Sequence, residues 1–196
     1  DLDGLSYVDF DSGAGMADGV THLAALGHRH IGLITLGRVT AQKEYGYTTW
    51  AHEGYAAACH QYNLPTYWCT TDLSTESVTA TVLDMLRTNP QITALITPQN
   101  QAIPGIFKAA GALGLRIPDD ISIVGLLEEA FAEVTTPPLT ALTFPSREMG
   151  EIAVDMLIAH LNDDDLPPQQ VLIRPRLHVR GSTGPLPTAQ LPRQQA

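Results

Sequence analysis

Short apolar runs alternate with longer amphipathic stretches along the chain, and this alternation predicts repeated strand–helix units. The runs at Ile31–Leu36, Thr93–Thr97 and Ile121–Val124 are rich in β-branched residues and too short for helices. Each is therefore expected to be a strand buried on both faces of a parallel sheet. Further strands are predicted at 6–11, 67–70, 139–144 and 171–179, and helices at 16–26, 50–62, 74–88, 101–113 and 147–161. Strands that alternate with helices are typical of an α/β fold.

Capping and helix-breaking residues refine these boundaries. Ser74 or Thr75 can cap the helix that follows it. Pro104 is compatible with a helix only in the first turn. Pro175 falls inside the predicted strand 171–179, which argues for a position at a sheet edge. The basic side chains that alternate with apolar residues in this strand are expected to form a solvated face: Arg174, Arg176, His178 and Arg180.

The charge balance limits the partners that this chain can have. Eleven basic residues against 21 acidic ones give a net charge of −10. Such a surface repels phosphate backbones, so the chain is not expected to bind DNA unaided. No apolar run approaches a membrane span, and no signal peptide is visible at the start. The protein is expected to be cytoplasmic. The chain opens at Asp1 without a methionine, and we expect that sequence upstream of it is missing.

A dinucleotide-binding motif is the first catalytic possibility to test. Gly13 and Gly15 follow a predicted strand and precede a helix, as in a Rossmann fingerprint. The position of the third glycine is Asp18, however, and the next strand ends at Leu36 without an acidic residue for a ribose. The fingerprint therefore fails, and no P-loop or nucleophile elbow is present.

Other candidate chemistry is equally sparse. His28 and His30 invite a metal hypothesis, but no cysteine or acidic cluster accompanies them, and turn or surface roles are favoured. Glu128 and Glu129 are adjacent as they leave a strand, so they point in different directions and do not form an acid–base pair. We expect no catalytic residue, no metal and no cofactor, and the chain is not predicted to be an enzyme.

Four motifs resemble the effector-binding core of the LacI/GalR (lactose-repressor) family of bacterial transcription regulators. They are LGHR at 26–29 followed by a strand, IPDDISIVG at 117–125, PPLT at 137–140 and VRGST at 179–183. The resemblance runs from about Tyr7 to Thr183. The motifs occur in the order and spacing of the family.

The resemblance implies a two-lobed, periplasmic-binding-protein-like (type I) α/β fold with an incomplete first lobe. Residues 1–36 and 144–176 are expected to form a partial N-terminal lobe, and residues 37–143 and 177–183 the C-terminal lobe. Residues 184–196 are rich in proline and glutamine and are expected to be a disordered tail. Relatives carry a DNA-binding head and further elements before this point. An apolar gap is therefore expected where the first lobe is incomplete, at Leu23, Ile31 and Leu33.

The family places a small effector in the cleft between the lobes. Where members commonly use an arginine, an Asn–Asp pair and an aspartate, this chain has Ala51, Gln99-Asn100 and Leu127. We therefore expect an effector that is less polar than a simple sugar, or one held by other polar groups. Alternatively, the pocket has lost its ligand and the fold persists for dimerisation. The expected effector-site positions are Trp50, Ala51, Leu73, Gln99, Asn100, Leu127 and Glu128.

The resemblance also implies subunit pairing and regulation. The expected dimer interface comprises Ile106, Phe107, Ala110, Val134 and Thr135. The chain is predicted to be the effector-sensing and dimerisation part of a transcriptional repressor, with DNA bound only through a helix-turn-helix domain absent from this sequence, and with no membrane partner. The alternative is an extracytoplasmic solute-binding protein of a transporter, which shares the fold.

Overall fold

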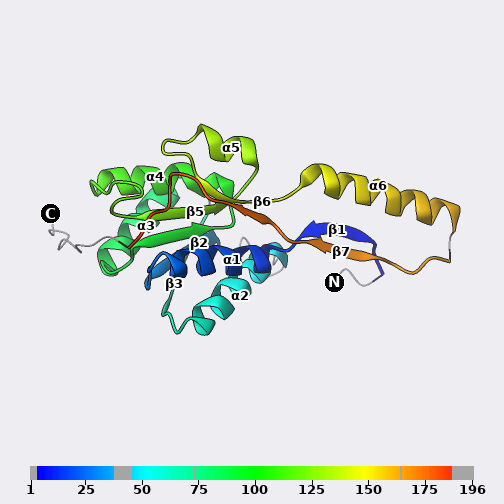
Figure 1. Cartoon of the computed structure of the whole chain (residues 1–196), viewed down its shortest axis with the longest axis horizontal. Coiled ribbons are helices and arrows are strands. Elements are labelled where there is room, and N and C mark those ends of the chain that lie inside the picture. Colours follow the sequence, from blue (N-terminus) through cyan, green and yellow to red (C-terminus); the bar gives the residue numbers. More distant parts are fainter. Residues whose placement is uncertain (1–3, 38–45, 73, 164, 187–196) are drawn as a thin grey trace.

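A six-stranded sheet forms the centre of the structure, which is a computed structural model that describes residues 4–37, 46–72, 74–163 and 165–186 (Figure 1). Its strands are β2 (Ile31–Leu36), β3 (Thr66–Thr71), β4 (Ala94–Thr97), β5 (Ser122–Leu126), β6 (Thr140–Thr143) and β8 (Arg176–His178). They lie in the order β3-β2-β4-β5-β6-β8. Neighbouring strands are parallel except β8, which joins β6 antiparallel.

Helices cover both faces of this sheet, which confirms the α/β class. The helices around it are α1 (Ser12–Ala25), α2 (Gly46–Gln61), α3 (Thr75–Thr88), the short η1 (Asn100–Ala102), α4 (Ile103–Ala112) and α5 (Glu129–Val134). Helices α1 and α2 pack on one face, and α3, α4 and α5 on the other. The sequence analysis did not predict α5. None of the helices in the described residues is long and apolar enough to span a membrane.

The inner strands contribute side chains to a core on each face of the sheet, because successive side chains point to opposite faces. In β2, Ile31 and Leu33 pack with α1 and α2, whereas Ile34 packs with α3 and α4. The predicted helix signals are also confirmed. The Ser74 hydroxyl accepts a hydrogen bond from the Ser77 backbone N–H at 3.2 Å, and Pro104 lies in the first turn of α4.

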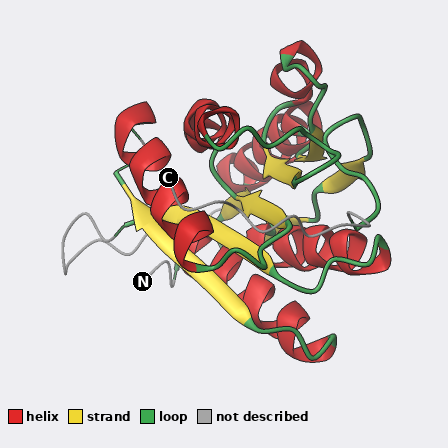
Figure 2. Cartoon of the chain, turned by 90° about the vertical axis from the view of Figure 1, so that its left-hand side faces the viewer, coloured by secondary structure: helices red, strands yellow, loops and turns green. Residues whose placement is uncertain are grey.

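A separate two-stranded sheet extends from one end of the molecule. It pairs β1 (Tyr7–Phe10) with β7 (Gln170–Ile173) in parallel, and α6 (Ser146–Asn162) packs against it (Figure 2). The single strand predicted at 171–179 is therefore wrong. It is divided at Pro175, which has no N–H to donate to a ladder, and its halves, β7 and β8, belong to different sheets.

The sheets also divide the chain differently from the predicted lobes. Residues 1–36 were assigned to the first lobe, but β2 pairs with β3 and β4 in the large sheet, and α1 packs against β4 and β5. The chain thus passes from the small sheet to the large one directly after β1. The difference arises because α1 packs on the large sheet and a short connection leads from it into β2. Elements joined by short connections usually remain in one sheet.

The apolar surface expected at an incomplete first lobe lies elsewhere. Leu23, Ile31 and Leu33 are fully buried, so the predicted gap at these residues is wrong. They pack in one core with residues of α2. This contact with α2 could not be predicted from the sequence alone. A group of exposed apolar side chains lies instead on α6, where four are 50% to 74% exposed: Val154, Leu157, Ile158 and Leu161.

Ion pairs hold the C-terminal strands against neighbouring helices. The Arg174 guanidinium pairs with the Asp18 carboxylate of α1 at 2.6 Å, and the Arg180 guanidinium with the Glu129 carboxylate of α5 at 2.9 Å. The predicted solvated basic face is thus only partly correct. Because Arg174 and Glu129 remain about half exposed or more, these pairs contribute modestly to stability.

A buried histidine ties the C-terminal segment to the large sheet. His28 is fully buried, so its predicted surface or turn role is wrong. Its Nε2 lies 3.1 Å from the Gly184 carbonyl and 3.0 Å from the Ser122 hydroxyl. A carbonyl can only accept, so Nε2 carries the proton and Nδ1 accepts from the Thr93 hydroxyl at 2.8 Å.

These contacts correct the predicted start of the disordered tail. Gly184 is held by His28 and Ser122, and the Leu186 N–H donates to the Leu26 carbonyl at 2.9 Å. Residues 184–186 are therefore ordered against the sheet and α1. The remainder of the predicted tail, 187–196, lies outside the described residues.

The His28 network predicts a loss of stability in mild acid. Burial lowers the pKa of His28 below its ordinary value of 6.5. Below pH 6.5 the folded protein then binds fewer protons than the unfolded chain, so the contribution of His28 to the free energy of unfolding should be complete at neutral pH and fall as the pH drops through 6.5. Urea denaturation at a series of pH values measures this slope.

A His28→Gln variant provides the control for that measurement. It should lose about 2 kcal/mol of unfolding free energy at neutral pH, because it strains or breaks buried hydrogen bonds. The slope below pH 6.5 should become shallower, with the remainder due to His22, whose pKa burial also lowers. An unchanged slope would contradict the assignment.

Candidate functional site

The candidate site lies where strands of both sheets end. The carboxyl ends of β1, β4, β5 and β6 surround a cavity of about 230 Å³. Parallel strands of an open α/β sheet place their ligand sites at this edge. The lining residues are Phe10, Pro98, Gln99, Asn100, Gln101, Leu126, Leu127, Glu128, Phe131 and Phe144.

Gln99 is the polar group most firmly held at this edge. Its backbone N–H donates to the Thr97 hydroxyl at 3.2 Å, and its side-chain Nε2 donates to the Thr35 hydroxyl at 3.4 Å. The residue is 3% exposed. Its Oε1 is buried and accepts no hydrogen bond from the described residues. A buried acceptor without a donor is costly, so a hydrogen-bond donor brought within reach of Oε1 would be stabilising.

An aromatic pair forms an apolar part of the same lining. The rings of Phe10 and Phe144 stack with centroids 5.0 Å apart and an interplanar angle of 15°. Phe10 ends β1 in the small sheet, and Phe144 follows β6 in the large sheet. The sequence analysis missed both because their contact depends on how two sheets meet. The available signal was that each is a large apolar residue at the carboxyl end of a strand.

The charge of the lining is low. Glu128 is the only ionised side chain among the lining residues; it is exposed and precedes α5. No group of three or more histidine, cysteine or acidic side chains that could hold a metal occurs in the described part of the chain. The arrangement therefore suits a neutral molecule that offers one apolar face and a hydrogen-bond donor.

The predicted effector-site residues separate into three groups. Gln99, Asn100, Leu127 and Glu128 lie together around the cavity. Ala51 is fully buried on the inward face of α2, so its predicted contact with an effector is wrong. The helix turns this position toward Tyr55 and the sheet instead of toward the rim. Leu73 lies outside the described residues.

Trp50 borders a second hollow beside the first. This hollow, of about 360 Å³, lies between the start of α1, α2 and β7. It is lined by Asp11, Gly13, Trp50, Glu53, Gly54, Ala57 and Leu172. Gly54 allows α2 to approach α1 closely, because a Cβ there would overlap the Gly13 backbone. Trp50 is thus placed at the junction of the two sheets but does not line the cavity around Gln99.

The predicted dimer residues also separate. Ile106 and Ala110 are fully buried in the core between α4 and the sheet, so their predicted contact with a partner is wrong. Their prediction rested on the family resemblance, and in this structure both residues lie on the inward face of α4. Phe107 is partly buried, Thr135 is partly exposed, and Val134 is 78% exposed.

Comparison with protein families decides the relationship. Residues 20–183 match the periplasmic binding protein-like domain. The transcriptional regulator reg1 of Streptomyces lividans is 31% identical over 193 residues, which cover 92% of this chain and 53% of that protein. The chain belongs to the periplasmic binding protein-like domain family. A LacI-family regulator from Mycobacterium smegmatis is among the structures similar to it.

Solved structures of LacI-family members share the fold. The regulator from Enterococcus faecium with bound ribose superposes with a TM-score of 0.80 at 22% identity, covering 92% of this chain and 66% of that one. The regulator from Arthrobacter sp. FB24 in complex with lactose has a TM-score of 0.77 at 20% identity, covering 90% and 66%. The predicted periplasmic-binding-protein-like fold is confirmed. The chain spans about half the length of the curated relatives that it matches.

The carboxamide oxygen of Gln99, which has no donor, predicts an unusual stability effect. Gln99→Met has a similar shape and removes a buried acceptor that has no donor. The free energy of unfolding should rise by about 1 kcal/mol, after the loss of the long bond to Thr35 is subtracted. Urea denaturation measures the change. A loss of stability would show that Oε1 is already satisfied.

Proposed function

We propose that this chain is the effector-sensing and dimerisation part of a LacI-family transcriptional repressor that acts in the cytoplasm. A small molecule binds the cavity around Gln99 and shifts the balance between arrangements of the two sheets. That shift alters the operator affinity of a helix-turn-helix domain outside this sequence. The observation that carries the proposal is the buried Gln99 Oε1 without a donor, at the edge where strands of both sheets end.

The proposed effector is neutral, with hydroxyl groups and one apolar face. Gln99 accepts one hydroxyl, and Asn100 and Glu128 offer further polar contacts. The stacked Phe10 and Phe144 provide the apolar contact. Since ribose and lactose are bound in similar structures, a carbohydrate is the favoured class. The absence of an aspartate at Leu127, which lines the cavity, favours a glycoside over a simple pentose.

The transporter alternative has no support among the relatives reported above. They are transcriptional regulators, and none is named as a solute-binding protein or as an enzyme. Gln99 also argues against the alternative that the pocket has lost its ligand. A pocket without a ligand has no reason to retain a buried acceptor at a cost in stability.

Calorimetry with ribose, lactose and phenyl β-galactoside tests the effector proposal. We expect lactose or the phenyl galactoside to bind more tightly than ribose, because the Phe10–Phe144 pair favours a larger apolar face. Gln99→Met should weaken binding about tenfold, since a buried hydrogen bond is worth about 1.4 kcal/mol. Gln61→Met, on an exposed helix end, is the matched control.

Two results would contradict this proposal. One is that none of the three compounds binds. The other is that binding is equally tight in the Gln99→Met variant and in the control.

The proposed homodimer uses the exposed part of the predicted interface, around Phe107, Val134 and Thr135. Val134→Glu should place a charge in an apolar contact and lower the mass measured by light scattering at micromolar concentration from dimer to monomer. Val154→Glu, on the exposed face of α6, should leave the mass unchanged. A monomeric mass for the unaltered protein, or dissociation by the control alone, would refute this interface.

A further inference from the structure

The edge strand β3 lies outside the proposed effector site, and its own residues include none of the charges or prolines that usually protect a sheet edge. Within the described residues it has one sheet neighbour, β2. Its sequence, TYWCTT, contains no charge and no proline, and consists mostly of aromatic and β-branched residues. Natural proteins normally protect such an edge with charges, prolines or covering elements. An unprotected edge with high strand propensity indicates a pairing surface.

The hydrogen bonds of β3 show which backbone groups face outward. The Tyr67 backbone N–H donates to the Tyr55 hydroxyl at 2.9 Å. The single proton of that hydroxyl is shared between two carbonyl acceptors, Ile31 of β2 at 2.8 Å and Tyr67 at 3.0 Å. The Thr71 carbonyl accepts from the Gly37 N–H at the end of β2. Backbone groups of alternate residues point to opposite sides of a strand.

It follows that the other set of alternate residues turns its backbone groups toward the open side. This set consists of Thr66, Trp68 and Thr70, and all three residues are exposed. Trp68 is 54% exposed, so a large aromatic side chain accompanies these unpaired groups. The edge thus offers donors, acceptors and an apolar contact to an incoming strand.

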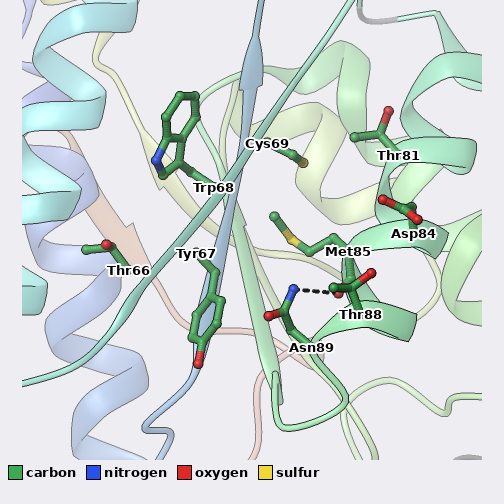
Figure 3. A pocket seen from close by; sticks show the side chains of 9 residues that line it. All are labelled: Thr66, Tyr67, Trp68, Cys69, Thr81, Asp84, Met85, Thr88 and Asn89. Carbon is green, nitrogen blue, oxygen red and sulfur yellow. Dashed lines mark hydrogen bonds between the residues drawn. The ribbon is translucent and has the colours of Figure 1, made fainter.

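A groove runs beside this edge, between β3 and α3. It encloses about 350 Å³. Figure 3 shows Thr81, Asp84 and Thr88 on α3 facing it, with Cys69 and Met85 at its base and Trp68 on the opposite side of the strand. A strand added to β3 would send alternate side chains into this groove and the others past Trp68.

The negative charge of Asp84 in the groove favours a partner with a positively charged side chain. Asp84 is the only carboxylate among the lining residues, it is exposed, and no Lys, Arg or His of the described residues forms an ion pair with it. A second copy of this chain would bring another uncharged β3 and a second Asp84, so it offers no complementary charge. The net charge of −10 opposes self-pairing further.

We propose that the open edge of β3 binds an extended peptide segment of a partner protein, with a Lys or Arg side chain that enters the groove to meet Asp84. The segment adds a strand to the large sheet through the outward backbone groups of Thr66, Trp68 and Thr70. This surface is independent of the proposed effector cavity, which lies at the carboxyl ends of the strands.

Two blocked, fluorescein-labelled peptides test the proposal by anisotropy: Thr-Val-Thr-Val-Lys-Val-Thr-Val-Thr and its analogue with Glu in place of Lys. We expect the Lys peptide to bind at least about tenfold more tightly than the Glu peptide, since like charge is placed beside Asp84 in the analogue. Asp84→Asn should reduce this preference to about threefold or less. Glu76→Gln, on the same helix but outside the groove, should preserve it.

A backbone substitution separates strand addition from simple charge attraction. Thr70→Pro removes one outward N–H at an edge position where proline is tolerated, and it should abolish binding of the Lys peptide. Thr70→Val keeps the N–H and should retain binding. Circular dichroism melting of both variants checks that they remain folded. On binding, hydrogen exchange of the Trp68 and Thr70 amides should slow.

Several results would overturn the proposal. They are the absence of binding by either peptide, equal affinity of the Thr70→Pro and Thr70→Val variants, and a preference that survives in Asp84→Asn. A doubled mass in light scattering that is lost in Thr70→Pro would assign the edge to a second copy of the chain, and would also overturn the proposal.

Discussion

Parallel pairing of β2 to β6 is the constraint on which the candidate site depends. Because these strands run in one direction, their carboxyl ends meet at one edge, and the loops that follow them converge there. Gln99 and Glu128 are 29 positions apart in the sequence and line one cavity because β4 and β5 are neighbours. The small sheet completes the enclosure by bringing Phe10 against Phe144. The site is thus a property of strand direction and sheet contact, and no single segment contains it.

The same edge shows how stability and binding oppose each other. The cores on both faces of the large sheet are fully packed, with strand side chains alternating between them. Against this background, three buried side-chain polar atoms of the described residues have no hydrogen-bond partner, and Gln99 Oε1 is the one that belongs to a residue lining the cavity. Residues that break a local rule in an otherwise consistent structure are expected at functional positions. His28 illustrates the opposite case, because each ring nitrogen of this buried polar side chain has a partner, and the residue joins distant segments instead of binding a ligand.

Much of the fold was predictable from the sequence because periodicity is a local property. The buried strands, the Ser74 cap and the position of Pro104 all follow from residues within one element. Features set by contacts between elements were not predictable in this way. Examples are the division of 171–179 into strands of two sheets, the burial of Ala51 and Ile106, and the meeting of Phe10 with Phe144. The positions Gln99 and Glu128 were predicted from the family resemblance, and they line one cavity because the ends of parallel strands converge.

A crystal structure of the protein grown with the tightest-binding saccharide tests the central claim most directly, because it locates the ligand. The account predicts electron density in the cavity between Gln99 and the Phe10–Phe144 pair, with a ligand hydroxyl within hydrogen-bonding distance of Gln99 Oε1. Density for the saccharide elsewhere on the chain, with the cavity unchanged and Oε1 still without a donor, would contradict it.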